Sequence, residues 1–246
     1  MCGITGILNF DQQPVSYSKI KLMTDSIIHR GPDGEGQWTD NYIGLGHRRL
    51  AIIDLSPAGH QPMQTRDGRY ILTYNGEVYN FKELRIELES LGYQFHSNTD
   101  SEVVLNAFAE WKDRCVEKFN GMFAFAIWDK KNQKLFLARD RYGIKPLYYY
   151  KTNQTIVFGS EIKAIIQSGL CRFLLDKEAL IEYLTFQNFF TDKTLFKNVK
   201  MLLPGHYACI ETSGRMNVKQ YWDFNFNGDL KISEAEAVEE IERLFK

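Results

Sequence analysis

Hydrophobic and polar positions along the chain predict many short strands and fewer helices. Residues 3–10 are apolar almost without interruption, which is typical of a buried strand. Residues 122–129 and 134–139 are two further apolar runs joined by a polar turn at 130–133, so they predict an antiparallel hairpin. Because the first of these two runs is apolar at nearly every position, we expect both of its faces to be covered.

Shorter patterns predict the remaining elements. The segment 44–54 is expected to form two short strands around His47–Arg49, and the strand 70–74 is expected to stop at Asn75-Gly76. The segments 147–150 and 155–158 are expected to continue the sheet of the hairpin. Further strands are expected at 206–211 and 217–222, and helices at 17–28, 80–91, 102–112, 160–166 and 177–184. Residues 29–36 are rich in glycine and proline, which indicates a loop that can move.

The chain changes character after residue 223. Residues 224–232 are polar and loop-like, and Ser233–Glu236 has the pattern of a capping box that opens a helix. That helix carries Val238, Ile241 and Phe245 on one side. We therefore expect one domain over residues 2–223, followed at 224–246 by a linker and the start of a helix leading to a further domain. The alternative is a C-terminal helix that docks on its own domain.

Composition and charge exclude several classes of function. The 30 basic and 31 acidic residues give a formal net charge of −1, so we expect a small-molecule substrate and neither a nucleic-acid nor a membrane partner. The N-terminus has no basic segment, and its apolar stretch is interrupted by Asn9 and Asp11, which argues against a secretory signal or a membrane span. The cysteines form no disulfide framework or zinc pattern, and no two histidines are spaced as metal ligands. We expect no metal and a location in the reducing cytoplasm.

The first two residues, Met1-Cys2, offer a catalytic group. Removal of Met1 by an aminopeptidase, which the small second residue permits, would leave Cys2 with both a thiol and a free α-amine. The unperturbed pKa values are ~8.5 for a thiol and ~7.7–8.0 for an α-amine, so moving a proton between them costs on the order of 1 kcal/mol. Nucleophile and base then belong to one residue, and no catalytic histidine is required. Taken alone, a Met-Cys start is more often the beginning of a buried strand.

Four other stretches could complete a site around that cysteine. Asn75 and Gly76 can supply a side-chain amide and a backbone N–H to an oxyanion, although Asn-Gly is also a common turn. Arg49 is suited to bidentate capture of a carboxylate, or to an internal salt bridge. Asp100 can hold an ammonium group or cap the helix that follows it. Arg30, in the mobile loop, could close over a substrate as a lid.

As an ordered set, these motifs resemble the class II glutamine amidotransferases, which are N-terminal-nucleophile hydrolases. The motifs are CGI (2–4), RGPD (30–33), HRRL (47–50), QPM (61–63), NGEVYN (75–80), TDSE (99–102) and GMFAFA (121–126). Within that class, RDRYGIKPLYY (139–149), SEIKA (160–164) and LPGHY (203–207) favour a resemblance to the glutaminase domain of the asparagine synthetases. The resemblance covers residues 2 to about 223, and none of these motif positions departs from the family pattern.

The resemblance implies an α+β fold, a four-layer αββα sandwich of two antiparallel sheets. It implies that Cys2 is the nucleophile, that its α-amine is the general base, and that Asn75 and Gly76 form the oxyanion hole. The implied substrate is glutamine. The residues implied to bind it are Arg49 at the α-carboxylate, Glu77 and Asp100 at the α-ammonium group, and Ile52 and Ile53 through their backbone.

The implied activity is hydrolysis of glutamine to glutamate and ammonia through a Cys2 thioester. The ammonia would serve an ATP-dependent synthetase domain, C-terminal in the same chain, whose SGGxDS loop is absent from these 246 residues. ATP, magnesium and aspartate would bind in that domain, so we expect no cofactor in the present one. Two alternatives stay open, namely a relative with another ammonia acceptor such as a surface-polysaccharide sugar, and a non-catalytic interaction domain that retains Met1. The oligomeric state also stays open, a homodimer included.

Overall fold

The protein is described by a computed structural model that covers residues 1–226 and 232–245. Within these residues the strands form two six-stranded antiparallel sheets. The first sheet has the order β10-β8-β9-β1-β3-β2, with bounds β1 (Gly3–Asn9), β2 (Gly34–Asp40), β3 (Ile43–Arg49), β8 (Tyr148–Lys151), β9 (Thr155–Gly159) and β10 (Val199–Met201). The second has the order β12-β11-β7-β6-β5-β4, with bounds β4 (Met63–Gln64), β5 (Tyr70–Val78), β6 (Gly121–Asp129), β7 (Lys134–Arg139), β11 (His206–Glu211) and β12 (Met216–Gln220).

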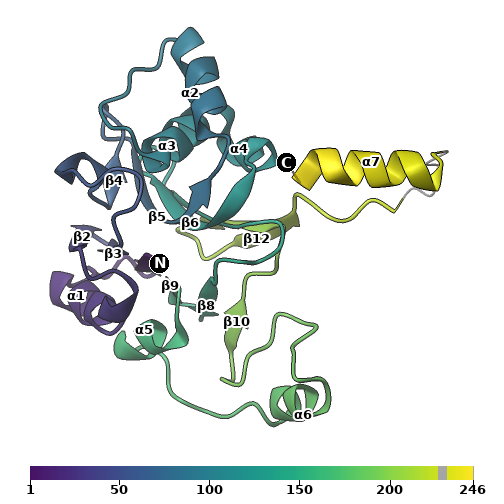
Figure 1. Cartoon of the computed structure of the whole chain (residues 1–246). Coiled ribbons are helices and arrows are strands. Elements are labelled where there is room, and N and C mark those ends of the chain that lie inside the picture. The colour runs from purple at the N-terminus through teal and green to yellow at the C-terminus, as the bar shows by residue number, and fades with distance from the viewer. Residues whose placement is uncertain (227–231, 246) are drawn as a thin grey trace.

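Helices cover the outer face of each sheet. The helices are α1 (Tyr17–Asp25), α2 (Phe81–Ser90), α3 (Asp100–Trp111), α4 (Cys115–Lys118), α5 (Ile162–Gln167), α6 (Lys177–Phe186) and α7 (Glu234–Phe245). Figure 1 shows α2, α3 and α4 beside β5 and β6, and α1 and α5 on the side of the N-terminal strands. Buried clusters lie between α1 and α5 and the first sheet, between the two sheets, and between the second sheet and α2 to α4. The predicted α+β sandwich of two antiparallel sheets is confirmed.

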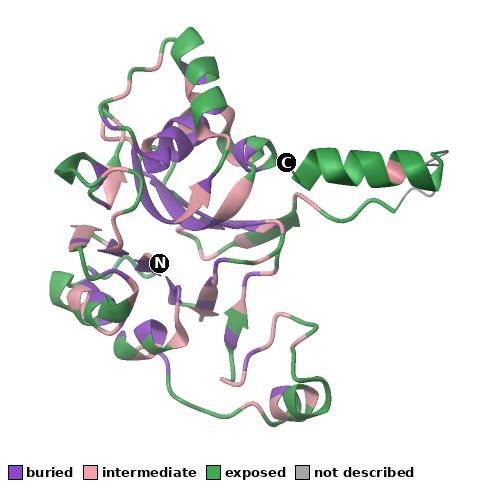
Figure 2. Ribbon diagram, in the orientation of Figure 1, coloured by how far each residue is buried: buried purple, intermediate pink, exposed green. Residues whose placement is uncertain are grey.

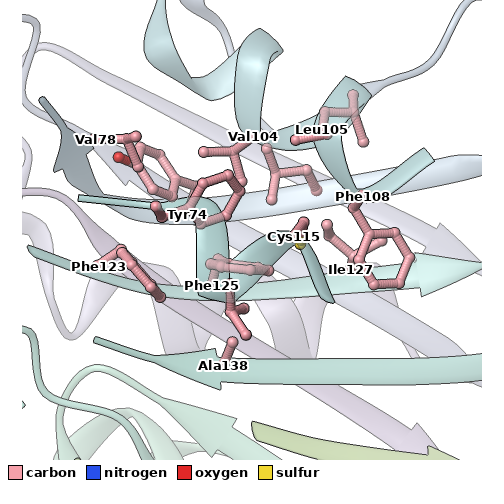
Figure 3. Packing of buried hydrophobic residues seen from close by; sticks show 14 of the residues in the cluster. Tyr74, Val78, Val104, Leu105, Phe108, Cys115, Phe123, Phe125, Ile127 and Ala138 are labelled. Carbon is pink, nitrogen blue, oxygen red and sulfur yellow. The ribbon is translucent and has the colours of Figure 1, made fainter. Parts of the chain in front are cut away.

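Strand β6 explains why the sequence 122–129 is apolar nearly throughout. Successive side chains of a strand point to opposite faces, so alternate residues enter different layers. Phe123, Phe125 and Ile127 pack in the cluster under the helices, and Figure 3 shows them in one cluster with Val104, Leu105 and Phe108 of α3. Ala124 and Ala126 pack in the cluster between the sheets. Both faces are therefore covered, as the pattern predicted.

Strand β5 is longer than expected and changes the position of the Asn-Gly pair. It does not stop at Asn75 but continues to Val78, with Asn75 opposite Ala124 and Gly76 opposite Phe123 in β6. A Cβ atom on Gly76 would lie 2.5 Å from the Met122 carbonyl oxygen, so glycine is required by close approach and not by a turn.

Other differences concern pairing that a local pattern cannot specify. The segment 44–54 forms one strand, β3, which ends at Arg49, and no second strand follows it. β2 begins at Gly34, inside the predicted loop, because it pairs with β3 along its whole length. β8 and β9 join the first sheet and not the sheet of the hairpin, and β10 was not predicted.

The C-terminal helix α7 begins with the predicted capping box. Ser233 N donates to the Glu236 carboxylate at 2.7 Å, and Glu236 N donates to Ser233 Oγ at 3.3 Å. Figure 2 shows α7 exposed over nearly all of its described surface, and Val238 and Ile241 are more than half exposed. The stretch 227–231 of the predicted linker lies outside the described residues. The further domain stays a prediction.

Neither a membrane span nor a metal cluster is found in the described ranges. No helix at 1–226 or 232–245 is long and apolar enough to cross a membrane. The same residues contain no group of three or more His, Cys, Asp or Glu side chains placed to hold a metal ion.

Candidate active site

A pocket lies at the start of β1, where the two sheets and the N-terminus of α3 meet. It is lined from the first residues of the chain, the segment 49–61, the middle of β5 and the start of α3. Eight of the nine residues proposed from the sequence line this one pocket: Cys2, Arg49, Ile52, Ile53, Asn75, Gly76, Glu77 and Asp100. They come from segments up to about a hundred residues apart, so the fold brings together what the sequence separates.

The pairing of β1 with β3 fixes Cys2 at the pocket. Gly3 of β1 pairs with Arg48 of β3. Cys2, which precedes Gly3, therefore lies beside the residues that follow Arg48. Leu50 N donates to Cys2 Sγ at 3.3 Å. On the other side, Arg30 Nε donates to the Cys2 carbonyl oxygen at 2.9 Å. The Leu50 backbone thus holds the sulfur and Arg30 holds the carbonyl, and Cys2 lines the pocket.

The Cys2 thiol is not activated by its surroundings alone. Burial raises its pKa above the ordinary value, and the Leu50 N–H and the Arg49 charge oppose that effect without reversing it. A thiol with a raised pKa is protonated at neutral pH, so a base must remove its proton before it can attack a carbonyl.

Histidine does not supply that base here. Among the described residues that line the pocket there is no histidine. His47 is fully buried, and burial lowers its pKa to about 3, so it is neutral; its Nε2 lies 3.1 Å from the Tyr74 carbonyl oxygen between the two sheets. His47 is a structural group, and the α-amine that removal of Met1 would expose on Cys2 stays the predicted base.

Asn75 presents an unused hydrogen-bond donor. The residue is 1% exposed and lies in the middle of β5. Its amide nitrogen Nδ2 is buried and has no hydrogen-bond partner among the described residues. Buried amide donors are rarely left unpaired, because desolvation without a partner costs about 1–3 kcal/mol. A donor left free in a pocket beside Cys2 is therefore available to an oxygen of a ligand.

Arg49 shapes one wall of the pocket. Its guanidinium donates to the Ser56 carbonyl at 2.8 Å and also to the Asp54 carbonyl. A Cβ atom on Gly59 would lie 2.2 Å from Arg49 Nη2, so only glycine allows the loop to approach the guanidinium this closely. Five N–H donors are available on a guanidinium, and those left over can bind a carboxylate. The nearby Ile52 and Ile53 side chains are exposed.

Asp100 is a buried carboxylate at the beginning of α3. The helix cap is Thr99, whose Oγ1 accepts from Glu102 N at 3.3 Å, so the capping alternative for Asp100 is wrong. Asp100 Oδ2 accepts from Tyr74 Oη at 2.6 Å and from Val78 N at 3.0 Å. Tyr74 and Val78 are seen side by side in Figure 3. Burial raises the pKa of Asp100, and its two donors oppose that rise.

Arg30 lies behind Cys2 and does not line the pocket. Besides its bond to Cys2, its Nη1 donates to Glu161 at 3.1 Å, and its side chain is 10% exposed. The segment around it is tied to the site, because Asp33 N donates to the Arg49 carbonyl at 3.0 Å and the Asp33 carboxylate accepts from Ala51 N at 2.9 Å. This placement makes Arg30 an anchor of the chain start, which differs from the predicted lid.

The structure adds two pocket residues that were not singled out from the sequence. Gln61 accepts from Tyr74 N at 2.6 Å and donates to Ser101 Oγ at 3.2 Å, so it links β5 to α3. Lys145 is 5% exposed, and its Nζ lies 3.2 Å from Met1 Sδ. Both lie within motifs that carry the family resemblance, QPM and RDRYGIKPLYY. Membership in those motifs is the only feature of the sequence that could have pointed to Gln61 and Lys145, and it assigns neither residue a role.

Comparisons with known proteins agree on one family. Residues 1–222 match the family model described as a glutamine amidotransferase domain. Asparagine synthetase [glutamine-hydrolyzing] 3 of Bacillus subtilis is 40% identical over 227 residues, which cover 91% of this chain and 37% of the relative. Amidase chry2 of Gibberella zeae is 36% identical over 265 residues, covering 100% of this chain and 38% of the relative. The chain thus spans well under half the length of these relatives.

A solved structure supports the fold. The glutamine phosphoribosylpyrophosphate amidotransferase of B. subtilis superimposes with a TM-score of 0.69 at 18% identity, covering 91% of this chain and 50% of that one. At this identity the likeness concerns the arrangement of sheets and helices and not the substrate.

Proposed function

This chain belongs to the glutamine amidotransferase domain family, and on that premise we propose that it hydrolyses the side-chain amide of glutamine through a Cys2 thioester. The ammonia would pass to an ATP-dependent synthetase domain in the same chain that makes asparagine, where ATP and magnesium would bind. This second part is supported by asparagine synthetase relatives at 40% identity of which the chain spans only 37% and 38%.

The chemistry divides into two acyl transfers. Once Met1 is removed, the α-amine of Cys2 takes the thiol proton and the thiolate attacks the amide carbon of glutamine. The oxyanion accepts hydrogen bonds from Asn75 Nδ2 and the Gly76 N–H, and the ammonium group of Cys2 protonates the departing ammonia. Water, giving its proton to the same amine, then attacks the thioester. Glutamate leaves, and the thiol recovers its proton.

The observation that carries this proposal is the free amide donor of Asn75. It is buried, unpartnered among the described residues, and in one pocket with Cys2. Such a donor has no structural use, and it is suited to the charge that develops on a carbonyl oxygen under attack by the thiolate.

Recognition of glutamine would rest on its two charged ends. Arg49, Asp100 and Glu77 all line the pocket. A cation and a pair of carboxylates in one pocket fit the α-carboxylate and α-ammonium groups of an amino acid.

The first test is direct. The chain with Met1 removed is incubated with glutamine, and glutamate and ammonia are measured separately. We expect the two products in equal amounts, and no ammonia from asparagine, whose amide is one methylene too close to the charged end. Absence of both products from a folded, Met1-free chain would contradict the proposal.

Replacement of Asp100 by asparagine is expected to raise the KM for glutamine roughly 10- to 100-fold, the loss of one charge-assisted contact. The effect depends on pH in a defined direction. Because burial raises the pKa of Asp100, its carboxylate is protonated at a higher pH than an exposed one, so in the unaltered chain KM should rise as pH falls through that pKa. This acidic rise should be absent from Asp100→Asn.

Steady-state kinetics between pH 4.5 and 8 measure this effect, with Asp192→Asn as a control that removes a partly exposed carboxylate paired with Lys200. A KM of Asp100→Asn equal to that of the unaltered chain would remove Asp100 from the ammonium site.

A different ammonia acceptor, such as a sugar, is the competing proposal for the second step. A relative named as an amidase matches the whole of this chain, so membership in the family does not decide the acceptor. An acceptor is identified by assaying the full-length protein with ATP and aspartate and testing for asparagine.

A further inference from the structure

Lys145 is a buried cation whose presence the proposed steps do not use. It follows β7, and its backbone is fixed on both sides, since Lys145 N donates to Asp140 Oδ2 at 2.9 Å and its carbonyl accepts from Arg139 Nε at 2.8 Å. Its ammonium lies 3.2 Å from Met1 Sδ and, within the described part of the chain, forms no ion pair. Burying an unpaired ammonium is costly, so a gain elsewhere is expected to offset it.

The charges around Lys145 are of both signs, and none neutralises it by direct contact. Burial, together with the positive charge of Arg30, lowers the pKa of Lys145. Cys2, Glu77 and Asp140 act in the opposite direction.

Two other charged groups of the site, Asp100 and Arg49, are engaged elsewhere. Asp100 is bonded to Tyr74 and Val78, and Arg49 binds the carbonyl groups of its own loop. Asp140 in turn accepts from backbone N–H groups at Phe123, Tyr142, Ile144 and Lys145. The ammonium of Lys145 therefore faces the start of the chain with no direct ion-pair partner among the described residues, and it is attracted only at longer range by Glu77 and Asp140.

Removal of Met1 changes what Lys145 faces. The thioether that contacts Nζ leaves with Met1, and a new α-amine appears on Cys2, one residue further along the chain. We propose that Lys145 is a positioning residue whose buried positive charge makes the thiol and α-amine of Cys2 lose their first proton at a lower pH, so that the nucleophile is ready at neutral pH.

The direction follows from electrostatics. The protonated pair, thiol plus ammonium, carries one positive charge more than the pair after loss of a proton, and a neighbouring cation destabilises it. The two groups titrate together, so the effect belongs to the pair, whichever atom gives up the proton. A single buried positive charge that lines the same pocket as Cys2 is expected to move this titration by about one pH unit.

The inference rests on the proposed function, and two readouts separate their failures. The first is kcat/KM for glutamine against pH for the Met1-free chain. The second is the rate at which iodoacetamide alkylates Cys2 against pH, followed by mass spectrometry of the N-terminal peptide. Alkylation reports the thiolate directly and needs no glutaminase activity.

Lys145→Met removes the charge and keeps the length of the side chain, and Lys145→Arg keeps the charge. Lys200→Met removes an exposed lysine on β10 as a matched control. For Lys145→Met we expect the acidic limb of the kcat/KM profile and that of the alkylation profile each to move up by about one pH unit. The value of kcat/KM should then be about tenfold lower at pH 6.5 and unchanged at pH 9. Lys145→Arg and Lys200→Met should follow the unaltered chain.

An alkylation profile of folded Lys145→Met that coincides with that of the unaltered chain overturns the inference. If that variant does not fold, the arginine variant decides, because an acidic limb displaced in Lys145→Arg contradicts a role that depends on charge alone. Absence of glutamine hydrolysis in the unaltered chain, with a shifted alkylation profile in Lys145→Met, would contradict the proposed function and leave the inference standing.

Discussion

Cys2→Ala is expected to abolish hydrolysis of glutamine by the Met1-free chain, with kcat at least about 10³-fold lower. Alanine keeps the small size at the start of β1 and keeps the α-amine, but it has no atom that can form the thioester. Arg30 Nε donates to the Cys2 backbone carbonyl, which alanine keeps, and the contacts that alanine loses are those of Cys2 Sγ with the Leu50 backbone, so the fold should tolerate the change. Loss of activity then reports chemistry and not folding.

The comparison uses Cys209→Ala as its control. Cys209 is a half-buried free cysteine on β11, outside the residues that line the pocket, so this variant should keep full activity. Ammonia release is measured by a coupled assay, and thermal unfolding confirms that both variants are folded. Appreciable turnover by Cys2→Ala would exclude Cys2 as the nucleophile.

Asn75→Ala is expected to lower kcat roughly 10²- to 10³-fold, the usual effect of removing one oxyanion donor, while KM changes little. The donor acts only when charge develops on the amide oxygen, so binding of the ground state should not depend on it. The effect on stability should be small in relation to the loss of activity. The lost Nδ2 group has no partner among the described residues, so no hydrogen bond is broken there.

Two further variants make that result specific. Asn75→Asp has nearly the same shape and replaces the donor by a charged acceptor, so it should be at least as inactive as Asn75→Ala. Asn153→Ala, in an exposed turn outside the pocket, should be unchanged. An Asn75→Ala enzyme with normal kcat and a raised KM would assign Asn75 to substrate binding and not to the oxyanion.

The local elements that the sequence predicted correctly are those whose pattern is complete within a short stretch. The hairpin of β6 and β7, the helices α2 and α3 and the capping box at Ser233 each combine a periodic pattern with its boundary signal. The two-faced burial of β6 could also be predicted, because a strand apolar at every position has no face suited to water.

What could not be predicted depends on partners distant in sequence. Asn75-Gly76 has the composition of a turn, and only the opposite strand, with the Met122 carbonyl against Gly76, shows that it lies within a strand. The segment around Arg30 is rich in glycine, which predicts a mobile loop. In the structure, the Arg30 side chain is held by its hydrogen bonds to Cys2 and Glu161. Lys145 carried no pattern of its own, since its meaning comes from burial beside the chain start.

We propose that Met1 blocks Cys2, so that catalysis depends on a free α-amine at Cys2. The most direct measurement compares two preparations of the same chain, one with Met1 removed and one with Met1 retained behind a blocking residue, each verified by intact mass. We predict glutamate and ammonia from the first preparation and none from the second, with both equally folded. Equal glutamine hydrolysis by the preparation that retains Met1 would show that catalysis does not require a free α-amine at Cys2.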